Sequence, residues 1–300
     1  MDEQNIKKGL NIYLYYWTIP AFFIFMAVNL FMKNFKLDID ANPMLSVVSF
    51  LFGFILSITF SMILTRYHSL KNNLSVETGK LIMLYSFSKH LGERFHERIK
   101  ELIDEYTIIT LRDYTNYGQG REVFFKFNQS IDLMNSKTDL QKNCVSSFFS
   151  ELRAWSEVRE GLEVLTEKRT EIALKLAIYT LGVILICLLF LNRGDIFTNT
   201  LFIVLSTIIV FIFLIIEDYD HLHIGDYAIN ISNSEELFDM IEKDRYYPEN
   251  VLNRVNLEKG RMYRIGIFDK KEGKEKIYSI RYSPVFNTRV KALADRVRGR

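Results

Sequence analysis

The sequence predicts a mainly α-helical protein that crosses a membrane four times and ends in a small module containing β-strands. Three observations support this fold class. The composition is 49% hydrophobic and includes 24 Phe, although 25% of the residues are charged. The apolar residues gather in four uncharged blocks, which suit helices crossing a bilayer core of ~30 Å, although the third block is short for a full span. The polar remainder shows helical periodicity, so it is folded chain and not loop.

The first two blocks form an N-terminal transmembrane hairpin, predicted as a domain of residues 1–66 with spans at about 10–32 and 44–65. Tyr and Trp cluster at the start of the first span, as in the aromatic belt of a membrane interface. This block is too long for a signal-peptide core and lacks a small-residue cleavage site, so we expect it to remain as a helix.

Residues 67–170 are predicted to form a cytoplasmic helical domain. Leu and aromatic residues recur at helical intervals between Ser75 and Tyr114, which predicts one long amphipathic helix. A second helix is expected over residues 122–136. A third should begin near Asp139 and run without a break into the next span.

A second transmembrane hairpin is predicted for residues 171–217, with spans at about 174–192 and 196–216. Four spans place both termini on the same side of the membrane. Most Lys and Arg near helix ends lie on that side, so the positive-inside rule makes both termini cytoplasmic. The sequence therefore predicts a multi-pass protein of the cell (inner or plasma) membrane.

The region 218–300 is predicted to contain a cytoplasmic exit segment, a helix and a β-hairpin with a basic tail. A short strand is expected over residues 227–231. The capping-box pattern Ser232–Glu235 should then open a helix that ends near Asp244.

Residues 262–269 and 275–282 alternate in the manner of two strands around a turn. The tail that follows, residues 287–300, is rich in Arg. Two interpretations of this tail are open, which are contact with anionic lipid headgroups and a disordered end.

One face of the second span is unusual for a helix that meets lipid. It carries small and aromatic side chains at steps of three and four positions, which places them together on one side of the helix. These residues are Ser46, Phe50, Gly53, Phe54, Ser57 and Ser61. They could form a packing seam between helices, or the wall of a pore with Phe50 and Phe54 as a hydrophobic constriction. Spacing alone favours the seam.

The segment after the fourth span is a candidate cation site. Asp218, Asp220 and Asp226 offer oxygen ligands for Ca²⁺ or another divalent cation, and the neighbouring His221 and His223 would suit a transition metal. The alternative is a charged segment that keeps the fourth helix from slipping into the membrane. No other cofactor is expected.

Catalysis and nucleic-acid binding find little support. The sequence has no P-loop, no Gly-x-Ser-x-Gly elbow and no His-Glu-x-x-His. The single Glu-x-x-His at Glu93 and His96 fits a solvated helix better than a di-iron site, which needs two such pairs. The net charge is only +2, with no basic groove interleaved with aromatics. We expect neither an enzyme nor a nucleic-acid partner.

Two spans, a long helical insert, two more spans and an acidic exit resemble the bestrophins, and more closely the bacterial and archaeal bestrophin-like domain family. Ser49–Phe54 matches the bestrophin signature Ser-Phe-x-x-Gly-Phe. Asp220 and Gly225 match the ends of the family's Asp-x-Pro-Phe-x-Gly pattern, with Leu222 and His223 in place of Pro and Phe. The resemblance covers roughly residues 9–244.

This resemblance implies a pentameric, anion-selective channel whose second helix forms a narrow neck. Phe50 and Phe54 would be two rings of that neck. The third neck position falls on Ser46, which is polar instead of aliphatic, and Val47 replaces the adjacent proline. Eukaryotic bestrophins clasp Ca²⁺ with acids after the fourth span, whereas the acids here are fewer and interrupted.

The combined prediction is a homo-oligomeric, anion-preferring ion channel with an apolar neck. Its partners would be further copies of itself, anions, and lipid headgroups at the basic tail. The alternative is a non-conducting membrane scaffold or sensor whose cytoplasmic domain recruits a partner.

Overall fold

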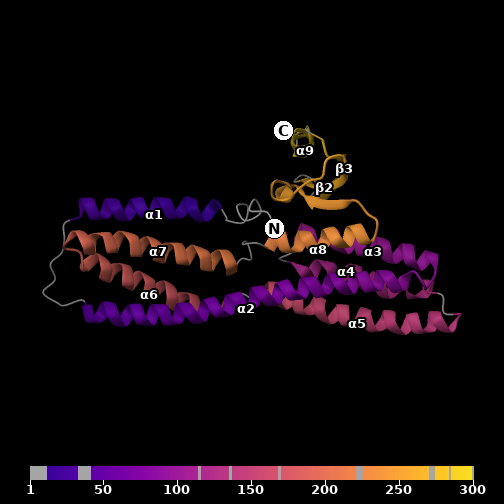
Figure 1. The fold of residues 1–300 in the computed structure, drawn as a ribbon, viewed down its shortest axis with the longest axis horizontal. Helices are drawn as coiled ribbons and strands as arrows, with labels where there is room; N and C mark the ends of the chain where they lie inside the picture. The colour runs from indigo at the N-terminus through magenta and orange to yellow at the C-terminus, as the bar shows by residue number, and fades with distance from the viewer. Residues whose placement is uncertain are drawn as a thin grey trace. The chain divides into compact units, whose positions relative to one another are not determined.

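The computed structural model describes residues 12–32, 42–113, 116–134, 137–167, 170–220, 226–269, 274–283 and 285–298. The fold is mostly helical with a small C-terminal sheet, as predicted (Figure 1). The chain divides into two compact units. One unit joins Met1–His68 to Lys168–Gly225, and the other joins Ser69–Glu167 to Asp226–Arg300.

The first unit contains α1 (Ile12–Phe31), α6 (Ile172–Leu191), α7 (Ile196–Asp220) and the first part of α2 (Asn42–Ser88). In the described part of the chain, three helical stretches are long and apolar enough to cross a membrane. They are α2, α7 and the stretch that includes α6. The described apolar part of α1, Tyr16–Phe31, is shorter. The count of four spans therefore stays a prediction.

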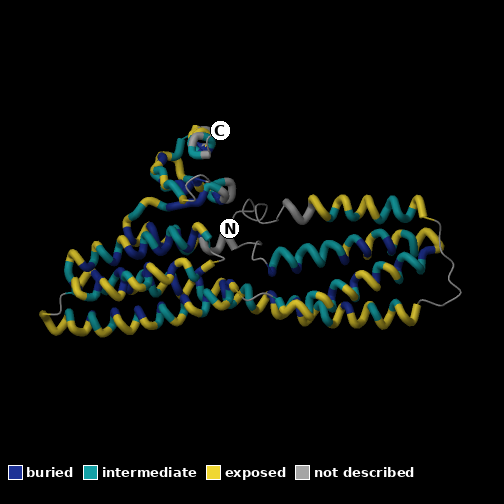
Figure 2. The backbone as a smooth tube through the Cα atoms, turned by 180° about the vertical axis from the view of Figure 1, so that it is seen from behind, coloured by how far each residue is buried: buried dark blue, intermediate teal, exposed yellow. Residues whose placement is uncertain are grey.

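The apolar helices of the first unit pack around α7, which contacts both α1 and α6. Gly182 of α6 permits a close approach, because a Cβ there would lie 2.2 Å from the ring of Phe213 on α7. Phe25 of α1 meets Phe202 of α7 edge to face, with ring centroids 5.7 Å apart. Many residues of these helices are exposed (Figure 2), which suits a surface that lipid or further subunits cover.

Helix α2 continues far beyond the predicted span. The expected boundary between a span ending at residue 65 and a new helix near Ser75 is wrong, because one helix covers Asn42–Ser88. Buried leucines continue the helical spacing past the span, at Leu70, Leu74, Leu81 and Leu84. This apolar seam packs in the second unit, and no Pro interrupts it.

The predicted amphipathic helix over residues 75–114 is broken into two. Helix α2 ends at Ser88, and α3 (Glu93–Arg112) begins after Gly92, whose φ of 112° favours glycine. The second predicted helix is α4 (Arg121–Gln129), followed by a single 3-10 turn to Leu133. The core of this unit includes Phe95, Tyr106, Phe127, Phe148 and Trp155, all fully buried.

The third helix of the polar segment, α5 (Asp139–Glu167), does not run unbroken into the membrane as expected. Glu171 has a ψ of 130°, outside the helical region, and α6 begins at Ile172. The sequence offers no Pro or Gly at this point, so the break had no local signal.

The strand predicted over residues 227–231 is wrong, because these residues belong to α8 (Asp226–Met240). Ile and Tyr gave the segment its strand propensity. In the structure, Ile231, Leu237 and Phe238 are buried in the core of the second unit, and this tertiary packing overrides the local preference.

The C-terminal sheet has the strand order β1–β2–β3. Strand β1 (Arg245–Pro248) pairs in parallel with β2 (Met262–Asp269), which pairs antiparallel with β3 (Lys274–Arg281). The two strands of the predicted hairpin are confirmed, whereas β1 was not predicted. The basic tail is a helix, α9 (Phe286–Arg298), so the disordered alternative is wrong for these residues. Contact of the tail with lipid headgroups stays a prediction.

Two polar contacts hold this sheet in place. Arg264 of β2 forms a two-pronged ion pair with Asp104 of α3, at 2.6 and 2.7 Å. Tyr246 of β1 donates a hydrogen bond of 2.6 Å to Glu275 of β3, across the intervening strand. Gly266 lies beneath that bond, and a Cβ at this position would stand 2.2 Å from both partners.

Candidate functional site

The polar and aromatic stripe predicted on the second span lies on the exposed side of α2. All six residues of the stripe are exposed within the single chain. They are Ser46, Phe50, Gly53, Phe54, Ser57 and Ser61. Phe50 is 71% exposed and Phe54 57% exposed, as are other phenylalanines on the outer faces of this unit, such as Phe197 at 69%. Among the described residues, no atom outside the adjoining backbone of α2 lies within 4 Å of a Cβ built on Gly53.

The two phenylalanines stack on each other along the helix. Their ring centroids are 6.4 Å apart and their planes are inclined by only 12°. They therefore present one continuous aromatic surface about one helical turn in height.

The opposite face of α2 packs inside the first unit. Phe52 and Ile63 are buried there, and Phe52 meets Phe213 of α7 with ring centroids 6.4 Å apart. Thr59 is fully buried on the same side and bonds back to the carbonyl of Ile55 at 3.0 Å. Within the described chain, the packing surface of α2 is thus its apolar face, and the stripe stays uncovered.

The acidic exit segment contains a buried ion-pair network centred on Asp220. The Asp220 side chain is fully buried, and it accepts hydrogen bonds from the backbone N–H and the hydroxyl of Thr170 at 2.6 and 2.7 Å. Lys175 lies 2.8 Å and Arg66 3.6 Å from its carboxylate. Two cations and two hydrogen-bond donors therefore already surround this carboxylate.

The neighbouring acid Glu217 shares Lys175 with Asp220. Glu217 accepts hydrogen bonds from Lys175 at 3.1 Å and from the Tyr179 hydroxyl. The side chain of Asp226, and residues His221 and His223, lie outside the described structure. Among the described residues, no group of three or more His, Cys, Asp or Glu is placed to hold a metal ion. The cation site stays a prediction, and the contacts of Asp220 favour the membrane-exit interpretation.

We expect Asp220→Asn to lower the thermal midpoint of the purified protein, because Lys175 would lose its buried partner. The expected loss is about 3 kcal/mol of unfolding free energy. A chelator should leave the midpoint of the unmodified protein unchanged. If the chelator lowered it as far as the substitution does, the carboxylate would be a cation ligand.

A buried carboxylate in the second unit was missed by sequence analysis. Glu77 of α2 is 5% exposed and accepts a hydrogen bond of 2.5 Å from the Tyr106 hydroxyl. Weaker bonds of 3.4 Å come from the Trp155 indole N–H and the Tyr117 hydroxyl. The signal was present, because Glu77 occupies the step between Leu74 and Leu81 in the apolar seam of α2.

The environment of Glu77 favours its neutral form. Burial raises the pKa of Glu77 to about 7, against the lowering effects of its hydrogen bonds and of the Arg159 charge. Burial and the proximity of Glu77 also raise the pKa of the Tyr106 and Tyr117 hydroxyls, which remain donors. Arg159 is itself buried and pairs with Glu163 at 3.2 Å. The carboxyl therefore changes its charge near neutral pH.

Comparison with known proteins identifies the family. A family model of the Bestrophin-like domain matches residues 20–233. The chain belongs to the Bestrophin-like family. The match begins within α1 and stops within α8, so it includes the rest of both apolar hairpins and the helical domain. Strands β1, β2 and β3 and helix α9 of this Bestrophin-like protein lie outside it.

Solved structures share the fold of this Bestrophin-like chain. A membrane protein crystallised with a single substitution matches with a TM-score of 0.60 and 13% identity, over 77% of this chain and 98% of its own. A bacterial bestrophin homologue from Klebsiella pneumoniae matches with a TM-score of 0.56 and 13% identity, over 79% of this chain and 99% of its own. Identity this low shows a common fold alone. No curated protein matches the chain.

Proposed function

We propose that this Bestrophin-like protein is a homo-oligomeric ion channel that prefers anions and whose neck is formed by α2. One observation carries the proposal, which is the exposure of the stripe from Ser46 to Ser61 while the opposite face of the same helix is packed. Serines and a bare glycine gain little from contact with lipid, so a water-facing or subunit-facing position suits them. The scaffold alternative, with this face buried against spans of the same chain, lacks such support.

In the proposed assembly, copies of α2 surround an axis and direct Phe50 and Phe54 toward it. Rings of phenyl groups make a constriction from which water withdraws, so ions pass only when the neck is wide or wetted. The edge of each phenyl ring carries partial positive charge, which favours an anion over a cation of similar size. The serine hydroxyls on either side of the neck would form hydrogen bonds to the anion before it enters and after it leaves.

The proposed channel has four spans and lies in the cell membrane with both termini in the cytoplasm. The basic residues near helix ends support this orientation. The bestrophin resemblance adds a pentamer as the expected assembly. Five copies would also bring five Glu77 sites into one channel.

The mass of the particle in mild detergent tests this proposal directly. We expect native mass spectrometry to give a closed ring of identical copies, with a pentamer as the expected species. A denaturing detergent should reduce the same sample to single chains. A monomer in several mild detergents and in lipid nanodiscs would exclude a pore on the axis of an oligomer.

A further inference from the structure

Strand β3 is an edge strand, and it has a free side within the described structure. The sheet contains β1, β2 and β3 in that order, so only β2 pairs with β3. An edge strand carries a row of unpaired N–H and C=O groups, which another extended chain can use.

The backbone shows which β3 groups face the free edge. Beyond the strand end, the Tyr282 N–H donates to the Arg261 carbonyl at 2.9 Å, and the Tyr282 carbonyl accepts from the Gly260 N–H at 3.1 Å. Gly260 has a φ of 85°, and together with Arg261 it forms a β-bulge opposite Tyr282, whose backbone N–H and C=O both point toward β2. In an antiparallel pair, the backbone groups of successive residues point alternately toward and away from the partner strand. The N–H and C=O of Ser279 and Arg281 therefore point away from β2.

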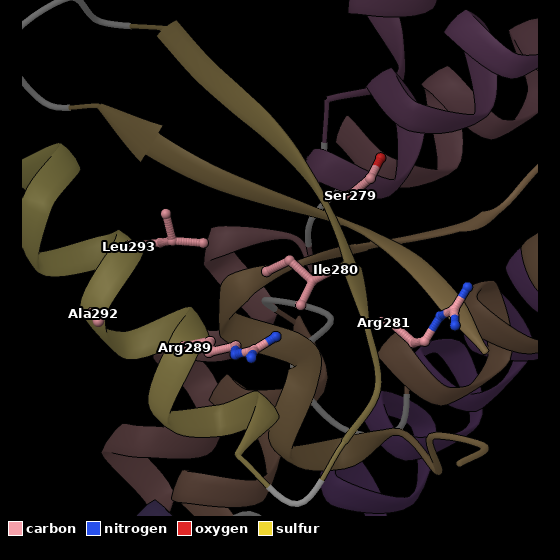
Figure 3. A pocket seen from close by; sticks show the side chains of 6 residues that line it. All are labelled: Ser279, Ile280, Arg281, Arg289, Ala292 and Leu293. Atoms are coloured by element: carbon pink, nitrogen blue, oxygen red, sulfur yellow. The ribbon is translucent and has the colours of Figure 1, made fainter. Parts of the chain in front are cut away.

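Helix α9 forms a wall beside this edge. Its residues Phe286, Val290 and Ala294 are buried against the sheet. A notch of about 440 Å³ remains between the helix and the strand, lined by Ser279, Ile280, Arg281, Arg289, Ala292 and Leu293. Figure 3 shows Arg289, Ala292 and Leu293 following one another on α9 beside the three β3 residues.

The notch combines an apolar floor with basic rims. Ile280 and Leu293 supply the apolar part, and the exposed Arg281 and Arg289 supply the charge. From Lys274 to the C-terminus the chain has eight Lys or Arg and two acids, Glu275 and Asp295. An acidic partner fits this charge. A second copy of β3 fits less well, because antiparallel self-pairing about the strand centre would set Lys274 opposite Arg281.

We propose that the β3 edge and α9 form a docking groove for an extended acidic segment of a partner protein, which adds to the sheet as a fourth strand. The partner's backbone would bond to Ser279 and Arg281. Side chains that face α9 would enter the notch over Ile280 and Leu293, with Arg289 at its rim. The acidic side chains that alternate with them would pair with Arg281 on the other face of the strand. The groove lies outside the Bestrophin-like match, so it is a property of this chain's own C-terminal module.

The probe for this proposal is a fluorescent peptide of alternating Glu and Val, seven residues long, titrated against the full-length protein in detergent. Two further peptides separate the contributions. One has the same sequence with every backbone amide N-methylated, which removes strand pairing at both edges of the peptide but keeps the charge. The other has the sequence of β3 itself.

We expect the plain peptide to bind, N-methylation to weaken binding at least about tenfold, and the β3 peptide to bind weakly or not at all. Arg281→Glu with Arg289→Glu should abolish binding. The matched charge control is Lys259→Glu with Lys291→Glu, two exposed residues that do not line the notch, and it should weaken binding much less.

Ser279→Pro tests the edge itself, because it removes an outward N–H and leaves the ladder to β2 intact. We expect loss of peptide binding with an unchanged thermal midpoint. Should this variant fail to fold, the N-methylated peptide still decides the question.

Equal binding of the plain and N-methylated peptides would overturn strand addition. Tighter binding of the β3 peptide would make a second copy the occupant instead. Arg-dependent binding of dihexanoyl phosphatidylserine micelles, with no Arg-dependent peptide binding, would assign the arginines to a lipid surface and overturn the proposal.

Discussion

Phe50→Ala with Phe54→Ala should raise anion flux from protein-containing liposomes by roughly tenfold or more. The two rings are the largest exposed side chains of the stripe, and they stack into one aromatic surface. Removing both would widen the neck and let water enter it. Because neither ring packs into the core cluster of the first unit, the cost in stability should be small. Chloride efflux, normalised to the reconstituted protein, is the measurement.

A matched control uses the same helix and the same kind of truncation. Leu51 and Ile58 are each 41% exposed on α2 but lie beside the stripe. Leu51→Ala with Ile58→Ala should change flux much less than the phenylalanine pair. Equal flux from both double variants would remove Phe50 and Phe54 from the permeation path, and background flux in every case would favour the non-conducting scaffold.

Glu77→Gln should stabilise the protein above neutral pH by about 3 kcal/mol, the equivalent of the shift of the Glu77 pKa from 4.5 to about 7. The glutamine keeps a carbonyl acceptor for Tyr106 and never carries a buried charge. In the unmodified protein, the raised pKa means that the folded state binds the proton more tightly than the unfolded state. Its stabilising effect is complete below about pH 4.5 and is lost as the pH rises through about 7.

The measurement is the thermal midpoint of both proteins from pH 4.5 to 8.5. The difference between them should be small at the acidic end and grow until about one unit above pH 7. Glu236→Gln, at an exposed position of α8, should keep the pH profile of the unmodified protein. A constant difference between Glu77→Gln and the unmodified protein across this range would mean that Glu77 keeps one protonation state throughout.

Much of the fold could be predicted from the sequence, because membrane spans and amphipathic helices have strong periodic signals. The apolar blocks, the face of α2 that carries Phe50 and the hairpin over residues 262–282 all follow from hydropathy and spacing. The exposure of that face could not be predicted, since a seam and a pore wall share the same small residues. In the structure that face lies opposite the packed Phe52 and Ile63, and whether it lines a pore stays a prediction.

The failures share a physical cause, which is that tertiary contacts outweighed local preference. Residues 227–231 have strand propensity, but α8 buries Ile231 among core residues of distant sequence. Strand β1 has only four residues, and its pairing with β2 is parallel, so no hairpin turn announces it. Glu77 lies in a polar segment, where a charged residue is usually solvated. Its place between Leu74 and Leu81 in the apolar seam of α2 is the signal that indicates its burial.

The bond from Tyr246 to Glu275 makes the three strands of the C-terminal sheet depend on one another. Its two partners belong to β1 and β3, and they meet above Gly266 of β2. The bond can therefore exist only when all three strands are assembled, and any side chain at position 266 would obstruct it. The amide protons of β2 should accordingly exchange with solvent in a single cooperative opening event together with those of β1. The Tyr246–Glu275 bond therefore forms only when the last of the three strands pairs, however early the β2–β3 hairpin folds.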